Sequence, residues 1–121
     1  MSRQYLIVHM TDRDGEGWDD ATDIARLDDW IADTKATGRN LGGSPVGERD
    51  EAKAVAVRGG EVVVTDGPFP EFKEWFMGYD LISADSMQEA VDIVATHPSA
   101  KLGKLYVLPA VPLAWKREDE S

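Results

Sequence analysis

The order of apolar and polar residues divides the chain into short blocks of strand and helix character. Residues 4–10, QYLIVHM, form a β-prone apolar run between polar neighbours, which predicts a strand buried on both faces. Residues 52–58 alternate in polarity, and a second β-prone run, EVVVT, begins at residue 61. Between them stand Gly59 and Gly60, which can adopt the positive φ angles of a tight turn. The second pattern therefore predicts a β-hairpin.

Two segments have the periodicity of amphipathic helices. The first covers about 21–37, with Asp20 as the N-cap and Gly38 beyond its end, and its predicted buried stripe is Ile24, Leu27, Ile31 and Thr34. The second lies in SMQEAVDIVATHP, where Ser86 and Glu89 have the spacing of a capping box. Its predicted buried stripe is Met87, Ala90, Val91 and Val94.

The remaining apolar blocks complete the fold. A short strand is predicted near Leu41, another over 78–84, and a last one in KLYVLPAV, residues 104–111. The order of elements predicts an α+β fold, a ferredoxin-like split βαβ sandwich with both helices on one face of an antiparallel sheet and an extra hairpin. We expect one domain over 1–112 and a charged C-terminal tail over 113–121.

The first strand also predicts how the chain assembles. Tyr5 and Ile7 lie on one side of it and Leu6 and Val8 on the other, so the sheet face away from the helices needs a cover as well. A second copy of the chain is the natural cover, which predicts a homodimer. A monomer with a solvated sheet face is the alternative.

Composition and charge narrow the choice of partners. The 121 residues include 13 Lys and Arg against 23 Asp and Glu, a net charge of −10, and 42% hydrophobic residues, which fits one folded acidic domain. This negative field opposes binding to nucleic acids and to anionic membrane surfaces. No apolar stretch approaches the roughly 18 residues that span a bilayer, and the N-terminus lacks the pattern of a secretory signal, so we expect a cytoplasmic protein. The absence of cysteine excludes disulfides and thiol chemistry, and no cofactor is expected.

One segment carries a recognisable motif. In VVVTDGPFPEFKEWFMGY, residues 62–79, a strand runs into a DGPF sequence, then acidic and Lys-Glu positions, then a Gly-aromatic strand start. The motif residues are Asp66, Gly67, Pro68, Phe69, Glu71, Lys73, Glu74, Gly78 and Tyr79. This pattern resembles the YCII-related family, in particular the branch named for its DGPF motif, and weaker agreement extends to about residue 112.

The resemblance implies a fold and a type of chemistry. The fold is the dimeric α+β barrel, and the implied active site pairs a His near the start of the first helix with an acidic residue. A chlorinated-hydroquinone dehydrochlorinase is similar to the family, so lyase or hydrolase-like acid–base chemistry on a small molecule is the implied activity. In this chain Leu27, which cannot transfer a proton, occupies the position of that His, and Tyr106 and Leu108 replace the usual Glu and Arg of the last strand. Whether this chain is an enzyme therefore stays open at the level of sequence.

The residues themselves suggest a replacement catalytic pair. His9 at the end of the first strand and Asp66 at the end of the hairpin are candidates for the acid and the base. The candidate ligand contacts are Tyr79, Lys73, Trp30 and Phe69. The alternatives are structural: Asp66 in a turn, His9 packed in the core, and Lys73 as solvated charge on a short helix. Phe69, like Trp75 and Phe76, is alternatively a core or interface anchor.

Two further patterns predict no functional site. His97, just before a proline, is expected to be a cation that interacts favourably with the dipole at a helix C-terminus. The spacing of a calcium loop is found in five residues: Asp12, Asp14, Glu16, Gly17 and Asp23. However, a strand precedes them where a helix is expected, and the later positions of the loop fit poorly. An acidic, solvated loop is the better interpretation, and no metal site is predicted. The sequence thus predicts a cleft for a small organic ligand, with a non-catalytic regulatory or protein-interaction module as the alternative function.

Overall fold

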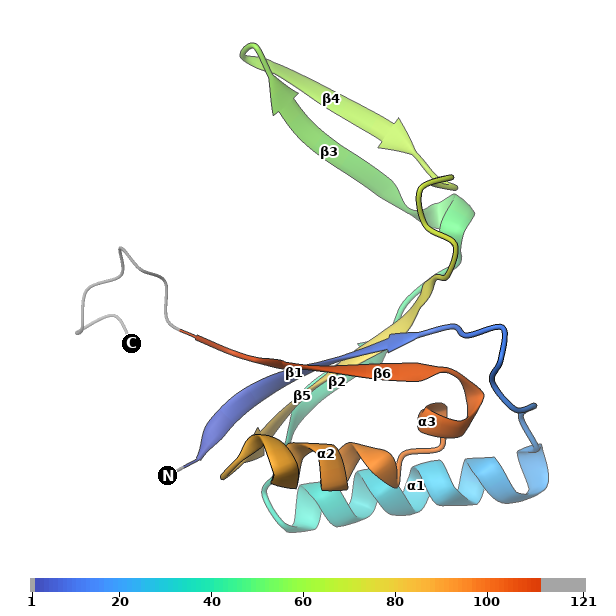
Figure 1. Ribbon diagram of the computed structural model, residues 1–121, viewed down its shortest axis with the longest axis vertical. Coiled ribbons are helices and arrows are strands. Elements are labelled where there is room, and N and C mark those ends of the chain that lie inside the picture. The colour runs from blue at the N-terminus through green and yellow to red at the C-terminus, as the bar shows by residue number, and fades with distance from the viewer. Residues whose placement is uncertain (1, 112–121) are drawn as a thin grey trace.

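The computed structural model describes residues 2–111, which form a two-layer α+β body with a long arm (Figure 1). Four antiparallel strands make the main sheet in the order β2-β5-β1-β6: β1 (Arg3–Met10), β2 (Asn40–Pro45), β5 (Phe76–Ala84) and β6 (Lys104–Pro109). The helices lie together on one face of this sheet: α1 (Asp20–Ala36), α2 (Met87–Ala95) and α3 (Ser99–Leu102). The ferredoxin-like α+β fold predicted from the order of elements is confirmed. The predicted tail over 113–121 lies outside the described residues.

The arm is the predicted hairpin, and it stands apart from the main sheet. Strands β3 (Lys53–Arg58) and β4 (Glu61–Asp66) pair only with each other, after the single 3-10 turn η1 (Arg49–Glu51). At its tip Gly59 and Gly60 have φ angles of +56° and +81°, which side chains other than glycine rarely adopt. In Figure 1 the arm projects away from the body, so the main sheet does not cover either of its faces.

The core lies between the sheet and the helices. Because side chains alternate along a strand, β1 turns Tyr5 and Ile7 toward the helices, where they are 2% and 0% exposed. They form one cluster with side chains from β5, α1 and α2: Trp30, Ile82, Ala84, Ala90 and Val94. The same alternation turns Leu6 to the opposite face, where no helix covers it, and it is 36% exposed.

The start of α1 lies one residue earlier than predicted. The N-cap is Asp19, not Asp20, because the Asp19 carboxylate accepts from the backbone N–H of Ala21. The Asp23 carboxylate accepts from the backbone N–H of Asp19 in return, so two backbone donors at the helix start are satisfied. At the other end Gly38 has a φ angle of +73°, and the predicted end of the helix is confirmed.

The predicted buried stripes of the helices are only partly right. In α1 the buried residues are Asp23, Trp30 and Thr34, whereas Ile24 is 48% exposed. The Asp23 carboxylate takes an inward position, where it forms an ion pair with Lys101 of α3, and the apolar pattern did not predict this. In α2 the buried residues are Ala90 and Val94, whereas Met87 and Val91 are 41% and 39% exposed.

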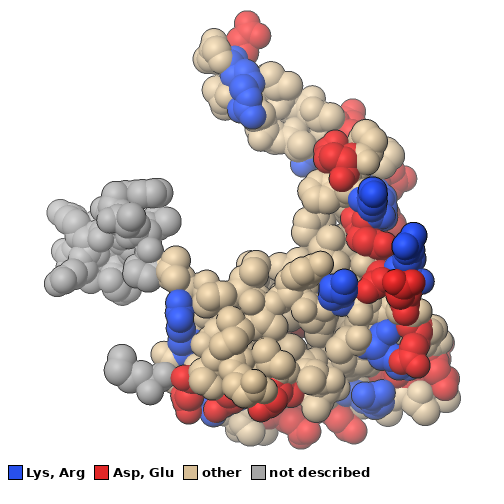
Figure 2. Space-filling model, viewed as in Figure 1, with Lys and Arg blue, Asp and Glu red and all other residues tan. Residues whose placement is uncertain are grey.

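Charge is unevenly distributed over the surface. In Figure 2 the acidic side chains gather along the helix layer and around the base of the arm, whereas the hollow between arm and sheet is mostly uncharged in this view. Among residues 2–111, no helix combines the length and the apolar character that a membrane crossing demands. In this view the acidity therefore follows the helix layer and the base of the arm and avoids the hollow between arm and sheet.

Candidate functional site

A cleft of about 260 Å³ opens between one end of the main sheet and the helices. Strands β1 and β5 contribute His9 and Asp80, helix α1 contributes Leu27 and Trp30, and His97 follows the end of α2. Most of the remaining wall is apolar, so a few polar groups converge in a largely apolar setting, as in many small-molecule sites.

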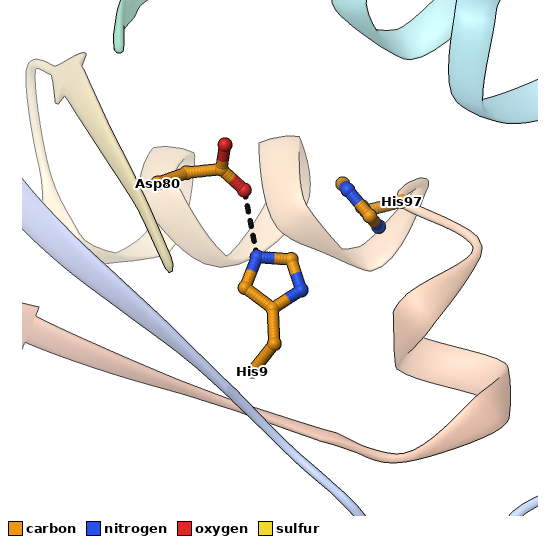
Figure 3. A group of neighbouring side chains, drawn as sticks. All are labelled: His9, Asp80 and His97. Atoms are coloured by element: carbon orange, nitrogen blue, oxygen red, sulfur yellow. Dashed lines mark hydrogen bonds and ion pairs between the residues drawn. The ribbon is translucent and has the colours of Figure 1, made fainter. Parts of the chain in front are cut away.

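The polar centre of the cleft is a hydrogen bond between two neighbouring strands. His9 lies on the same side of β1 as Ile7, and Asp80 lies on the same side of β5 as Ile82, so both side chains point toward the helices. His9 Nε2 and Asp80 Oδ2 are 2.6 Å apart (Figure 3). The side chains are 7% and 16% exposed, so water screens this contact only weakly. An ionised Asp80 accepts the bond, which leaves the proton on His9 Nε2 and a lone pair on His9 Nδ1.

His97 lies beside this pair, and its predicted role as a cation is wrong. Its ring contacts the rings of His9 and Trp30, with 4.7 Å between centroids in each case, and only 7% of the residue is exposed. Burial, and to a smaller extent repulsion from a protonated His9, lower the pKa of His97 to about 4, while the charge on Asp80 opposes the shift. His97 is therefore neutral at pH 7, and burial outweighs the helix dipole.

The three residues also have the composition of a metal site. His9, Asp80 and His97 offer ligand atoms within 4.8 Å of one another. However, the backbone N–H of Ser99 donates to His97 Nδ1 at 3.0 Å, so the proton of the neutral ring is on Nε2. A metal at Nε2 would have to displace that proton to Nδ1 and break the bond to Ser99. The arrangement favours hydrogen bonding and proton transfer over metal binding.

Two of the predicted ligand contacts lie at this cleft. Trp30 forms part of its wall, and its indole N–H donates to the backbone oxygen of Ile93 at 2.8 Å, which fixes the ring. Tyr79 borders the cleft, but it precedes Asp80 in the strand and its side chain therefore turns toward the open sheet face, where it is 44% exposed. Ligand contact by either residue stays a prediction.

The structure gives His9 a different carboxylate partner from the one predicted. Asp66 ends β4 on the arm, where it is exposed and forms an ion pair with Lys53, and it does not line the cleft. The predicted pairing of His9 with Asp66 is corrected to His9 with Asp80, because the strand that carries Asp66 is not part of the main sheet. Lys73 also lies outside the cleft, in an irregular loop rather than on a short helix.

The DGPF segment closes the base of the arm. The backbone N–H of Gly67 donates to the backbone oxygen of Ala52 at 2.8 Å. Phe69 is buried against the rings of Phe72 and Trp75, and this group of side chains lies away from the cleft. The motif has a visible structural function here, and the interpretation of Phe69 as a packing anchor fits its position better than a ligand contact does.

The first and last carboxylates of the calcium-like spacing have other partners. Asp12 accepts from the backbone N–H of Asp14 and lies 3.7 Å from the ammonium of Lys104. Asp23 is fully buried with the ammonium of Lys101 at 2.5 Å, and this hydrogen bond lowers the pKa of the Asp23 carboxyl. The side chains at the two ends of the pattern are thus each engaged by a lysine.

Asp80 is the residue that sequence reasoning missed. It lies in FMGYDLISA, a strand that is otherwise mostly apolar, and a carboxylate inside such a strand is a signal in itself. A buried charge is costly unless it is paired, so its presence indicates a partner on a neighbouring element. The sequence does not say which partner, because that depends on the order of strands in the sheet.

The comparison with protein families identifies the family of the chain. Residues 4–113 match the family profile of the YCII-related domain, which is almost the whole chain. No curated protein matches the sequence. The match therefore identifies the family of the chain but does not identify a ligand or a reaction.

Proposed function

The chain belongs to the YCII-related domain family, and we propose that it binds a small organic molecule in the cleft beside β1 and transfers a proton with His9 and Asp80. The observation that carries this proposal is the 2.6 Å hydrogen bond between the two side chains in a mostly apolar cleft. Such a pair can take a proton from a ligand and return it. We further assign the chain to the DGPF branch on the basis of residues 66–69.

The two side chains have different roles in this proposal. Asp80 holds the Nε2 proton of His9, so His9 Nδ1 carries the free lone pair and acts as the base. When Nδ1 accepts a proton, the ring becomes positive and the adjacent carboxylate stabilises that charge. The reaction class is acid–base chemistry of the lyase or hydrolase-like type, because the same base can take a proton from carbon or from water.

Leu27 supports this assignment rather than opposing it. The resemblance places a histidine at this position, and Leu27 lines the same cleft as His9. A proton-transferring imidazole thus reaches the cleft from β1 instead of from α1. The alternative function, a non-catalytic interaction module, would need only the exposed apolar surfaces and no base in a cleft.

The test is carbon–deuterium exchange with a panel of carbon acids. The protein is incubated in D₂O with acetylacetone, 2-oxo acids and phenols, and loss of C–H signals is followed by NMR. We expect exchange above the buffer rate with at least one compound, and a loss of about 100-fold or more in His9→Asn and in Asp80→Asn. Circular dichroism verifies that each variant is folded.

Asp66→Asn is the matched control, because Asp66 is the carboxylate that the sequence alone would have chosen. We expect it to leave the exchange rate unchanged. Loss of exchange in Asp66→Asn with full activity in Asp80→Asn would return the base role to the arm. Absence of both binding and exchange across the panel would contradict the proposal.

We also propose that the protein is a homodimer. The sheet face away from the helices carries exposed apolar side chains, among them Leu6, Tyr79, Tyr106 and Leu108. A groove of about 410 Å³ on this face runs to the base of the arm, where Trp75 and Phe76 line it. A second copy presents the same surface, so the contact is self-complementary. Light scattering at micromolar concentration is expected to give twice the chain mass of 13.3 kDa, and a 13 kDa species would contradict the proposal.

A further inference from the structure

His97 has a fixed protonation pattern that the proton transfer by His9 and Asp80 does not use. Its Nδ1 accepts a hydrogen bond from the backbone N–H of Ser99 at 3.0 Å. A backbone N–H can only donate, so Nδ1 has no proton and the neutral ring carries its proton on Nε2. Turning the ring over would break this bond, because a carbon would take the place of Nδ1. The fold therefore presents an N–H donor of fixed orientation.

The surroundings keep this donor neutral. The charged groups that face the ring are His9 from β1 and Asp80 from β5, and α1 contributes the uncharged Trp30. Burial and the charge on His9 both lower the pKa of His97, to about 4. The ring of His97 therefore stays neutral at pH 7 and keeps its Nε2 proton.

The donor is accessible to a ligand. Among the described residues, the only fully buried side-chain nitrogen or oxygen without a partner is Asp23 Oδ1, so His97 Nε2 is not sealed inside the core. His97 lines the same cleft as His9 and Asp80, and the three side chains offer atoms within 4.8 Å of one another. A ligand oxygen bonded to His97 would therefore lie in the same cleft as the side chains of His9 and Asp80.

We propose that His97 is a ligand-binding residue that donates its Nε2–H to a carbonyl or phenolate oxygen of the ligand. This inference rests on the proposed function and names its substrate class: a small molecule with a mostly apolar body and one oxygen that becomes or remains an anion. Leu27, Trp30 and Met77 supply the apolar walls for that body. When His9 Nδ1 takes a proton from the carbon next to a carbonyl, the electron pair of the C–H bond moves to the oxygen, and His97 stabilises the resulting enolate.

A neutral imidazole suits this role better than a charged one. A charged His97 would repel the imidazolium that forms on His9, whereas a neutral N–H donor does not. The donor is also in place before the reaction, so no reorganisation is needed as the charge develops. A purely structural His97, held by Ser99 and packed edge to face against Trp30, would show the same ring position without any effect on an anion in the cleft.

The first test is the protonation pattern itself. Protein labelled with ¹⁵N in its histidines is examined by long-range proton–nitrogen NMR at pH 7. We expect His97 to show an unprotonated Nδ1 and a protonated Nε2, with no change down to about pH 5. A proton on Nδ1, or a charged ring at pH 7, would overturn the proposal.

The second test uses 4-nitrophenolate as a probe, because it has an aromatic body, one anionic oxygen and its own absorbance. Binding is measured at pH 8.5 for wild type, His97→Phe and His97→Gln. Phe preserves an aromatic ring but removes the donor, and Gln places an amide N–H near the position of Nε2. We expect His97→Phe to weaken binding about tenfold or more and His97→Gln to restore it to within about threefold of wild type.

The outcomes separate this inference from the proposed function. Equal binding by wild type and His97→Phe would overturn the role of His97 while leaving the cleft as a binding site. Failure of wild type to bind the probe, together with no exchange in the carbon-acid panel, would overturn both. Weak binding by both His97→Phe and His97→Gln would show that the ring has a packing role only.

Discussion

At the scale of single residues, the candidate site depends on a contact between residues far apart in sequence. His9 and Asp80 are separated by 71 positions and meet because β1 and β5 are neighbours in the sheet. Strand alternation predicts that His9 faces the core, but it does not identify the strand beside it. For the same reason the carboxylate of Asp66, at the end of another strand, looked equally suitable in the sequence. Which carboxylate pairs with His9 is therefore decided by the tertiary structure.

The protonation state of His97 also could not be predicted from the sequence. Its place at a helix end could be predicted, and the dipole there favours a cation. The rings of Trp30 and His9 bury it, however, and the cost of desolvating a charge in this position exceeds the dipole effect. Sequence reasoning gave the location correctly and the protonation state incorrectly, because burial is a property of the packed fold.

The buried neutral His97 predicts a loss of stability in mild acid. Its pKa is 6.5 when unfolded and about 4 when folded, so below pH 6.5 the unfolded chain binds a proton that the folded chain does not. The free energy of unfolding is expected to fall by about 3 kcal/mol between pH 6.5 and pH 4 from this group alone. Urea unfolding at pH 7, 5.5 and 4.5 measures it.

His97→Phe is the control, because it keeps an aromatic ring and cannot bind the proton. The difference in unfolding free energy between wild type and variant is expected to shrink or reverse as the pH falls. Asp23, whose pKa is also lowered, adds a loss of the same sign, but only below pH 3.8 and in both proteins. A pH-independent difference would contradict the assignment.

At the scale of elements, the features that depend on local sequence were predictable. The Gly59-Gly60 turn, the end of α1 at Gly38 and the Ser86 cap of α2 all lie where the pattern places them. Each is decided by backbone geometry within a few residues. The helix faces were less predictable, because the inward position of Asp23 depends on Lys101, 78 residues away. The pattern treated that carboxylate as solvent-facing.

The DGPF loop gives a prediction at this scale. A Cβ atom added to Gly67 would lie 1.9 Å from the backbone oxygen of Arg49, so the loop and η1 would have to move apart. Gly67→Ala is expected to lower the free energy of unfolding by about 1–3 kcal/mol, as overpacking does, or to open the base of the arm. Urea unfolding measures the first effect, and hydrogen exchange of the arm amides measures the second.

Gly17→Ala is the matched control for the loop, because nothing lies within 4 Å of a Cβ at Gly17. It is expected to change stability by less than about 0.5 kcal/mol. If Gly67→Ala behaves like Gly17→Ala in both measurements, the close packing of the DGPF loop against η1 does not exist in solution.

At the scale of the whole molecule, the main unexplained feature is apolar surface. An isolated two-stranded hairpin is at best marginally stable in water, yet the arm exposes four valines on one face: Val55, Val57, Val62 and Val64. The exposed sheet face is also apolar, and the hollow between the two is mostly uncharged in Figure 2. In the same view the acidic residues lie along the helix layer and around the base of the arm, so much of the hollow is available for an apolar contact despite the net charge of −10.

If a second copy covers the valine face of the arm, substitutions on that face should affect dimer formation and substitutions on the opposite face should not. Val64 belongs to the four-valine face, whereas its neighbour Val63 points to the opposite face of β4, which carries mostly alanine and polar side chains. Val64→Lys places a charge in the contact and is expected to convert the dimer to a monomer in light scattering. Val63→Lys has the same charge change one residue away and is expected to stay dimeric. Dissociation of both variants, or of neither, would mean that the valine face of the arm is not the contact between copies.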